Sequence, residues 1–168
     1  MRQASVIVLG ILLLAGCSMG GEVPVSGGGP LPGGETARVV QVIDGDTIDV
    51  NLNGEQVRVR YVGVNTPERD QSCYSEARAA NSSMVSGQTV TLLRDTSDTD
   101  QYGRLLRYIY VGDTFVNEQL VRGGWAEVVV YQPDDQYADD FRMLEQQAAQ
   151  SGLGCHPSGI FDDGSYTR

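Results

Sequence analysis

Carboxylate, guanidinium and amide side chains recur at the ends of segments that alternate apolar and polar residues. They stand in Asp44-Gly45-Asp46-Thr47, at Arg60, in Asn65-Thr66-Pro67-Glu68 and in Asp100-Gln101-Tyr102-Gly103-Arg104. Hard cations such as Ca²⁺ take carboxylate, amide and backbone oxygens as ligands. Arginine forks bind phosphate through paired hydrogen bonds, and a carboxylate can orient or deprotonate a water. Together these residue types suit the attack of water on a phosphorus atom held beside a metal ion.

Each of these residues has a simpler explanation when it is considered alone. Asp and Gly are common in turns between strands. Arg58 and Arg60 share one face of a strand, and that face can be solvated. A loop carboxylate such as Glu68, or a turn arginine such as Arg104, is usually exposed to water. The order and spacing of the set, rather than any single residue, favour a shared site.

The elements that must position this set follow from the hydrophobic pattern. Alternation predicts strands at 38–44, 47–52, 57–64, 89–93 and 105–111. Asn53-Gly54 tolerates the positive φ of a tight hairpin between the second and third strands. Helical spacing predicts helices at 75–86, 116–122 and 136–150. This order predicts a β-barrel with helices, of the α+β class, built as a five-stranded OB-fold barrel.

The motifs, taken in order, resemble the staphylococcal nuclease (thermonuclease) family. The resemblance spans about residues 37–153 and continues beyond the site into 120–126 and Tyr131-Gln132-Pro133. It implies a Ca²⁺-dependent phosphodiesterase that acts on DNA and RNA. It also implies products that carry a 3′-phosphate and a 5′-hydroxyl.

The resemblance implies a metal site made of oxygen ligands. Asp46 would bind calcium through its carboxylate and Thr66 through its backbone oxygen. The remaining position, usually an aspartate in this family, is Asn65 here. An amide can still ligate through its oxygen but brings no charge, so we expect weaker calcium affinity.

Roles in catalysis and substrate binding are implied in the same way. Glu68 would act as general base on the attacking water or orient it. Arg60 and Arg104 would neutralise the pentacovalent phosphorane and assist departure of the 5′ oxygen. Tyr102 and Tyr131 match family tyrosines near the bound nucleotide. Two further departures, Gln101 in place of a lysine and Val129 in place of a tyrosine, predict lower nucleotide affinity.

The composition is acidic, which counts against attraction to nucleic acid by overall charge. The 168 residues include 22 Asp and Glu against 12 basic residues, all of them arginine, for a net charge of −10. Binding to nucleic acid is driven by phosphate neutralisation, so a local arginine cluster must overcome the field of the whole protein. A non-catalytic OB-fold lipoprotein that binds nucleic acid or a protein therefore remains the alternative to a nuclease.

The first 17 residues predict an export signal rather than part of the fold. Residues 6–15 form an apolar run after Met1-Arg2, about half the length that spans a membrane. Leu14-Ala15-Gly16-Cys17 resembles a lipobox, in which Cys17 is lipidated and becomes the mature N-terminus. An ordinary cleaved signal with an incidental cysteine is the alternative. We expect an exported protein that is lipid-anchored to a cell-envelope membrane or extracellular.

The remaining chain divides into three parts. Residues 18–36 are rich in Gly, Pro and Ser and predict a flexible tether. Residues 37–155 form the nuclease-like domain, and 156–168 are a C-terminal tail. No protein partner is evident from the sequence, so we expect a monomer.

Two cysteines remain if Cys17 carries lipid. In an oxidising compartment, Cys73 and Cys155 most simply form one disulfide between the segment before the first helix and the end of the domain. Two buried free thiols are the alternative. No spacing of Cys and His suggests zinc.

Overall fold

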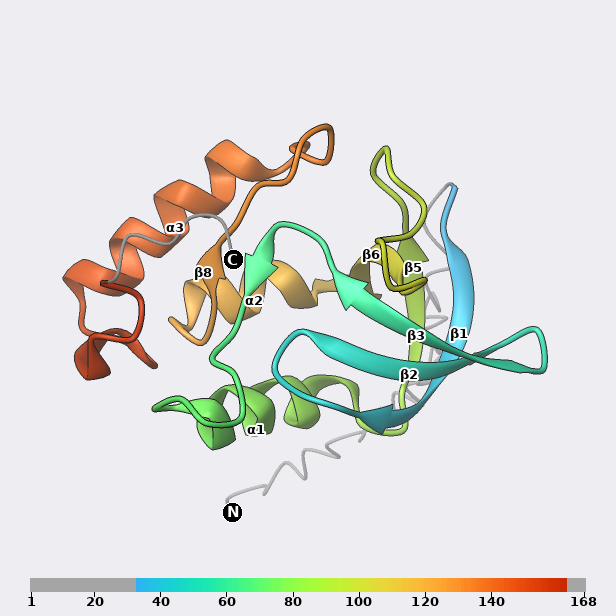
Figure 1. Cartoon of the computed structure of the whole chain (residues 1–168), viewed down its shortest axis with the longest axis horizontal. Coiled ribbons are helices and arrows are strands. Elements are labelled where there is room, and N and C mark those ends of the chain that lie inside the picture. Colours follow the sequence, from blue (N-terminus) through green and yellow to red (C-terminus); the bar gives the residue numbers. More distant parts are fainter. Residues whose placement is uncertain (1–32, 163–168) are drawn as a thin grey trace, which may run out of the picture.

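Five strands close into a barrel, as the alternation in the sequence predicts. The structure, a computed structural model, describes residues 33–162 (Figure 1). The barrel strands are β1 (Glu35–Val42), β2 (Thr47–Leu52), β3 (Glu55–Tyr61), β5 (Thr89–Leu93) and β6 (Leu105–Val111). Neighbours in the order β3-β2-β1-β5-β6 are antiparallel, and a parallel pairing of β3 with β6 closes the barrel. The prediction of an OB-fold barrel with helices is confirmed.

The β2–β3 hairpin forms where Asn53-Gly54 predicts it. Both residues have positive φ, 54° and 93°, as a tight two-residue hairpin loop requires. The resulting register places Thr47 opposite Arg60 and Asp49 opposite Arg58. Arg60 therefore lies next to the turn that precedes β2.

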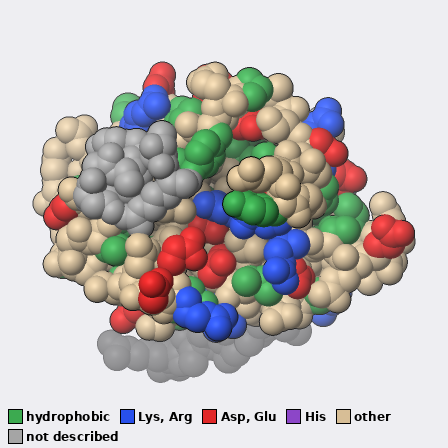
Figure 2. All heavy atoms as spheres, viewed as in Figure 1, with side chains coloured by type: hydrophobic (Ala, Val, Ile, Leu, Met, Phe, Trp, Pro, Cys, Tyr) green, Lys and Arg blue, Asp and Glu red, His purple; other side chains and the backbone are tan. Residues whose placement is uncertain are grey.

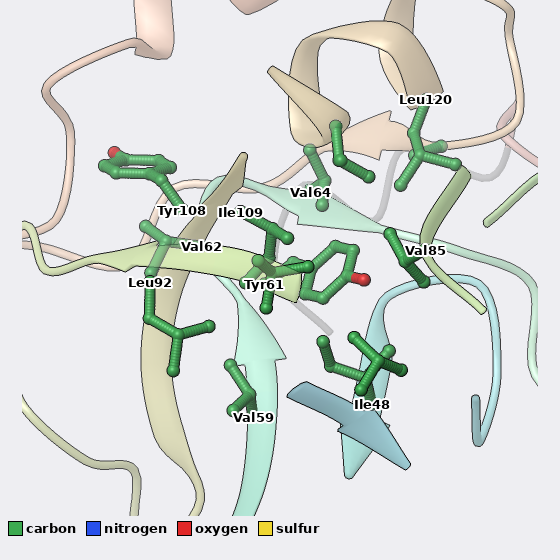
Figure 3. Packing of buried hydrophobic residues seen from close by; sticks show 14 of the residues in the cluster. Ile48, Val59, Tyr61, Val62, Val64, Val85, Leu92, Tyr108, Ile109 and Leu120 are labelled. Atoms are coloured by element: carbon green, nitrogen blue, oxygen red, sulfur yellow. The ribbon is translucent and has the colours of Figure 1, made fainter. Parts of the chain in front are cut away.

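The barrel interior is filled by the apolar residues of the alternating strands. Figure 3 shows Ile48, Val59 and Leu92 from three different strands within one packed cluster, and each is fully buried. Tyr61 is also buried, and its hydroxyl donates a hydrogen bond of 2.9 Å to Asn81 Oδ1. Burial of apolar surface contributes about 25 cal/mol per Å², so this cluster fixes the barrel and, with it, the strand ends that carry the site.

Three helices and one 3-10 turn accompany the barrel within residues 33–162. They are α1 (Tyr74–Val85), α2 (Val116–Arg122), α3 (Ala138–Gln150) and η1 (His156–Ser158). The helix α3 packs beside α2, on the side of the molecule away from β1 (Figure 1). It begins two residues later than predicted, because the Gln136 backbone N–H is bonded to Asp95 Oδ2 and Tyr137 is outside the helical region at φ −111° and ψ 12°.

Three very short strands are not predicted as separate elements, and the strand predicted over 57–64 ends at Tyr61, so that Val64 belongs to the first of them. They are β4 (Val64–Asn65), β7 (Thr114–Phe115) and β8 (Glu127–Val128). The strands β4 and β8 pair antiparallel and form a separate two-stranded sheet, with Asn65 directly opposite Glu127. Two residues are too few to show a period of two, so the sequence pattern carries no signal for them.

Cys73 and Cys155 form a disulfide with a Cα–Cα distance of 5.6 Å. The pairing is confirmed, and the alternative of two free thiols is excluded. The bond joins the residue before α1 to the residue before η1 across 82 positions of sequence. A loop of this length contributes about 4 kcal/mol to stability in the chain-entropy model.

The predicted signal segment 1–17, with Cys17, lies outside the described residues, as do 18–32 of the tether and 163–168 of the tail. Strand β1 begins at Glu35, two residues before the expected start of the domain. Across residues 33–162, every helix is too short or too polar to span a bilayer.

Candidate active site

A pocket of about 720 Å³ lies where the end of β3 meets the loop before β6. Six residues singled out from the sequence line it: Arg60, Asn65, Glu68, Tyr102, Arg104 and Tyr131. Arginine and carboxylate side chains gather near the centre of the face drawn in Figure 2. The other two predicted site residues, Asp46 and Thr66, do not line the pocket; they are buried, and Thr66 donates hydrogen bonds to Asp46. The structure thus brings together the whole set that the sequence predicts.

Barrel closure explains how the two arginines meet. The parallel pairing of β3 with β6 sets Arg60 opposite Leu106. Arg104 immediately precedes β6. Residues 44 positions apart in sequence therefore approach the same pocket from adjacent strands.

The turn between β1 and β2 packs tightly against Thr66. A Cβ on Gly45 would lie 2.6 Å from Thr66 Oγ1, so only glycine fits this contact. Asp46 Oδ2 accepts hydrogen bonds from the Thr66 backbone N–H (2.8 Å) and hydroxyl (3.0 Å). The turn and the end of β4 are thereby locked together. We refer to Asp46, Arg60, Asn65 and Thr66 as the barrel corner.

Arg60 is held in the barrel corner by several acceptors. Its Nε lies 3.2 Å from Asp46 Oδ1. Its Nη1 donates to the carbonyls of Tyr61 (2.8 Å) and Val64 (2.7 Å), and its Nη2 donates to Asn65 Oδ1 (3.1 Å). The side chain is only 14% exposed. The guanidinium is therefore oriented before any substrate arrives.

Asn65 connects Arg60 to a carboxylate that the sequence analysis did not single out. Its Nδ2 donates to Glu127 Oε1 at 2.8 Å, while its Oδ1 accepts from Arg60. Glu127 is buried, with 4% of its surface exposed. The two residues are 62 positions apart in sequence and meet only through the pairing of β4 with β8.

Negative charge is concentrated at the turn. Burial and the neighbouring charge of Asp46 raise the pKa of Asp44 to about 6. A carboxyl group whose ionisation is opposed by a neighbouring carboxylate in this way marks a position that favours a cation. Asp44 belongs to the Asp-Gly-Asp-Thr pattern, so the signal for it was present in the sequence.

The oxygen donors of the barrel corner fit a hard divalent cation. They are the Asp46 carboxylate, the Asn65 amide oxygen and the Thr66 backbone oxygen, which are ligands of the Ca²⁺ and Mg²⁺ type rather than the zinc type. Among residues 33–162 no three His, Cys, Asp or Glu side chains are grouped so that they could hold a metal. Such a site depends on one carboxylate and neutral oxygens.

Glu68 stands on the exposed rim of the pocket. Its loop is fixed by Gln71, whose Oε1 accepts from the Glu68 N–H at 2.7 Å and whose N–H donates to the Glu68 carbonyl at 2.8 Å. A carboxylate that is exposed on a held loop can contact water, which a general base requires.

Arg104 is held by its own loop, which we call the Arg104 loop (residues 95–104). Asp100 Oδ1 accepts from the N–H groups of Tyr102 (2.9 Å) and Arg104 (3.0 Å), and Asp100 Oδ2 lies 2.6 Å from Arg104 Nε. Burial raises the pKa of Asp100, but hydrogen bonds from the Arg104 backbone and guanidinium and the Tyr102 N–H outweigh it and keep that pKa below the usual value. The Arg104 guanidinium carbon lies 5.5 Å from the Tyr102 ring centroid, and Tyr102 is 76% exposed.

The loop that carries Tyr131 is tied to the Arg104 loop. It contains a cis bond between Gln132 and Pro133. Asp134 Oδ1 accepts from the N–H groups of Thr96 (3.0 Å) and Ser97 (2.7 Å). Asp134 lines the pocket and was not anticipated, because an Asp after Pro reads as an ordinary turn residue.

Comparison with known proteins matches residues 58–155 to a family model described as staphylococcal nuclease homologue. The chain is 43% identical over 121 residues to endonuclease YncB of Bacillus subtilis (strain 168). This match covers 67% of this chain and 57% of that protein. It is 35% identical over 120 residues to a thermonuclease of Staphylococcus hyicus, covering 68% of this chain and 71% of the relative. It is 33% identical over 149 residues to a thermonuclease of Staphylococcus intermedius, and the match covers 85% of this chain and 86% of the relative. The chain thus spans less than two thirds of YncB and most of each thermonuclease.

Proposed function

The chain belongs to the staphylococcal nuclease family, and we propose that it is a calcium-dependent phosphodiesterase that hydrolyses DNA and RNA. One observation carries the proposal: a single pocket presents Arg60, Glu68 and Arg104, with the oxygen donors of the barrel corner behind them. The names of the relatives, endonuclease and thermonuclease, support nuclease chemistry. The ion, the substrates and the products are inferred from the resemblance and from the donor set.

The barrel corner would hold the metal ion through Asp46, Asn65 and the Thr66 backbone oxygen. When bound, calcium supplies charge stabilisation at the phosphate and a fixed position for an attacking water. The hydrogen bonds from Thr66 to Asp46 keep this carboxylate in place in the absence of the ion.

Glu68 would accept a proton from the water or orient it toward phosphorus. Its exposed position on the pocket rim gives it access to solvent. General-base catalysis of this kind contributes about 10²- to 10⁴-fold to rate.

Arg60 and Arg104 would stabilise the charge that develops on the phosphoryl oxygens. Arg60 enters the pocket from β3 and Arg104 enters it from the loop before the adjacent strand β6, so one phosphate can be contacted from two sides. Departure of the 5′ oxygen then leaves a 3′-phosphate and a 5′-hydroxyl. Tyr102 and Tyr131 line the same pocket and offer ring faces for the neighbouring bases.

The experiment is digestion of DNA and RNA in millimolar Ca²⁺ and in excess chelator, over a range of salt concentrations. Wild type is compared with Glu68→Gln and with Glu55→Gln, which removes an exposed carboxylate at the far end of β3. We expect Glu68→Gln to lower kcat by about 10²-fold or more and Glu55→Gln to leave it unchanged. Binding of nucleic acid without cleavage by wild type would instead favour the non-catalytic OB-fold module.

We also propose that the protein is exported and attached to a membrane of the cell envelope through a lipid on Cys17, and that it acts there as a monomer. The sequence Leu14-Ala15-Gly16-Cys17 supports lipidation. Metabolic labelling with a fatty acid should mark wild type and not Cys17→Ser. Release of unlabelled wild type into the medium would support an ordinary cleaved signal.

A further inference from the structure

A buried carboxylate stands directly behind the barrel corner. Glu127 lies opposite Asn65 in the pairing of β8 with β4, and 4% of its surface is exposed. Charged side chains are rarely buried to this degree unless they are bonded. Glu127 accepts a hydrogen bond of 2.8 Å from Asn65 Nδ2, so its side chain contacts the one amide of the barrel corner.

This hydrogen bond decides which end of the Asn65 amide faces the site. The NH₂ group points to Glu127, and the oxygen therefore points toward Arg60 Nη2 at 3.1 Å. Arg60 in turn contacts Asp46. An amide whose two ends differ chemically needs such a partner to present oxygen rather than nitrogen to a cation.

The charges within the barrel corner leave a deficit for a divalent cation. Asp46 carries one negative charge, Arg60 carries one positive charge, and Asn65 and Thr66 are neutral. The neighbouring carboxyl groups lie outside the ligand set, Asp44 in the β1–β2 turn and Glu127 behind Asn65. A hydrogen bond from an amide to a carboxylate also polarises the amide and makes its oxygen a better ligand.

Arg60 does not depend on Glu127 for its own position. Three of its acceptors, Asp46 Oδ1 and the carbonyls of Tyr61 and Val64, hold it without Asn65. The group whose orientation depends on Glu127 is the amide.

We propose that Glu127 is a positioning residue of the metal site, which orients the Asn65 amide so that its oxygen is presented to the ion. The inference rests on the proposed function. Glu127→Gln replaces an acceptor-only carboxylate with an amide that can face Asn65 with either its oxygen or its NH₂ group, so the orientation of Asn65 is no longer fixed. Loss of a partner that orients a ligand typically weakens metal binding by about 10- to 100-fold, and we expect that range for this variant.

The test measures calcium binding alone, by isothermal titration calorimetry in the absence of nucleic acid. The variants are Glu127→Gln, Asn65→Asp and the double variant. Glu145→Gln is the matched control, because Glu145 Oε1 accepts from the Val128 N–H at 2.9 Å and so contacts the same strand β8 from α3. Thermal unfolding in chelator reports whether each variant keeps its fold.

The double variant separates orientation from structure. It carries the same total charge as wild type, with the carboxylate moved from position 127 to position 65. We expect calcium affinity to return to the wild-type value or above it, while Glu127→Gln alone stays about tenfold weaker or more and Glu145→Gln matches wild type. Asn65→Asp alone also raises affinity because it adds a ligand charge, so the decisive comparison is between two backgrounds. Glu127→Gln should weaken calcium binding beside the native Asn65 but not in the Asn65→Asp background, where both ends of the side chain are oxygen. A merely structural role of Glu127 would weaken binding equally in both backgrounds.

Three results would overturn the proposal. The first is a Glu127→Gln variant that binds calcium as tightly as wild type. The second is equal weakening by Glu127→Gln in the native and the Asn65→Asp backgrounds, and the third is equal weakening by Glu145→Gln. Digestion by wild type is measured in parallel. If wild type digests nucleic acid and binds calcium, and Glu127→Gln binds calcium equally well, only the role of Glu127 is overturned. If wild type neither binds calcium nor digests nucleic acid, the proposed function is overturned as well.

Discussion

The two sides of the pocket hold their arginines in different ways. In the barrel corner, Arg60 is 14% exposed and contacts acceptors on the β1–β2 turn, on β3 and on β4. On the opposite side, Arg104 is 31% exposed and is held by Asp100 of its own loop. The barrel corner is thus part of the folded core, whereas the Arg104 loop is a local structure fastened to it. Under the proposed function, the rigid side would hold the metal ion and the phosphate, and the more exposed side would contact the rest of the substrate.

The largest difference is expected between Arg60→Ala and Arg104→Ala. Removing Arg60 leaves the buried Asp46 without its cationic partner and two carbonyls without the guanidinium donor, so the free energy of unfolding should fall by about 3 kcal/mol. Removing Arg104 breaks a more exposed pair and should cost less than about 1 kcal/mol. Both variants should lose about 10²-fold or more in kcat. Denaturant unfolding monitored through Trp125 checks the first two values, and equal losses of stability would remove the distinction between the two sides.

Substitution of one glycine on each side of the pocket tests the comparison between the barrel corner and the Arg104 loop. Gly45→Ala places a Cβ 2.6 Å from Thr66 Oγ1, so we expect a loss of about 2 kcal/mol from overpacking and weaker calcium binding. Gly103→Ala meets nothing within 4 Å and is strained only by its φ of 80°, at a cost of about 1 kcal/mol. Its calcium affinity should equal that of wild type. Calorimetric titration of both variants checks the pair, and a Gly103 variant with weakened calcium binding would show that the loop also shapes the metal site.

A smaller effect is expected at the exposed ring of the Arg104 loop. Tyr102→Ala removes a stacking surface that is 76% exposed and contacts Arg104. Stacking of a base on such a ring contributes about 1 to 3 kcal/mol. We therefore expect KM to rise about tenfold with a smaller change in kcat. A fall in kcat at unchanged KM would instead assign Tyr102 to the chemical step.

The smallest effect is expected from the ionisation of Asp100. Its pKa is held below the usual value of 3.8 in the folded state. A carboxylate with a lowered pKa stabilises the fold above its unfolded pKa, and this contribution is lost as the pH falls through the folded pKa. The stabilities of wild type and Asp100→Asn should differ by less than about 1 kcal/mol near neutral pH and converge below about pH 3.8. Curves that diverge toward acid would contradict this sign.

The sequence predicts the barrel because each of its strands is long enough to show alternation. The hairpin follows from Asn53-Gly54, whose positive φ values are local properties of two residues. The meeting of Arg60 with Arg104 follows from the family order of the motifs, since no local pattern encodes the parallel closure of β3 on β6.

Glu127 shows why the rest of the site could not be predicted. It belongs to a two-residue strand, and its partner Asn65 lies 62 positions away in the other half of the same short sheet. Asp134 is similar, because its bonds to Thr96 and Ser97 join two loops that have no periodic pattern. Contacts of this kind arise only when the barrel has already placed the loops.

The most direct test of the central claim is the identity of the ends produced from a single-stranded DNA oligonucleotide. Wild type in millimolar Ca²⁺ should release fragments with 3′-phosphate and 5′-hydroxyl ends, and chelator should abolish cleavage. Mass spectrometry of the products distinguishes these ends from 3′-hydroxyl and 5′-phosphate. Fragments with 5′-phosphate ends, or cleavage that persists in chelator, would contradict the account of a metal-dependent site built from Asp46, Glu68 and the two arginines.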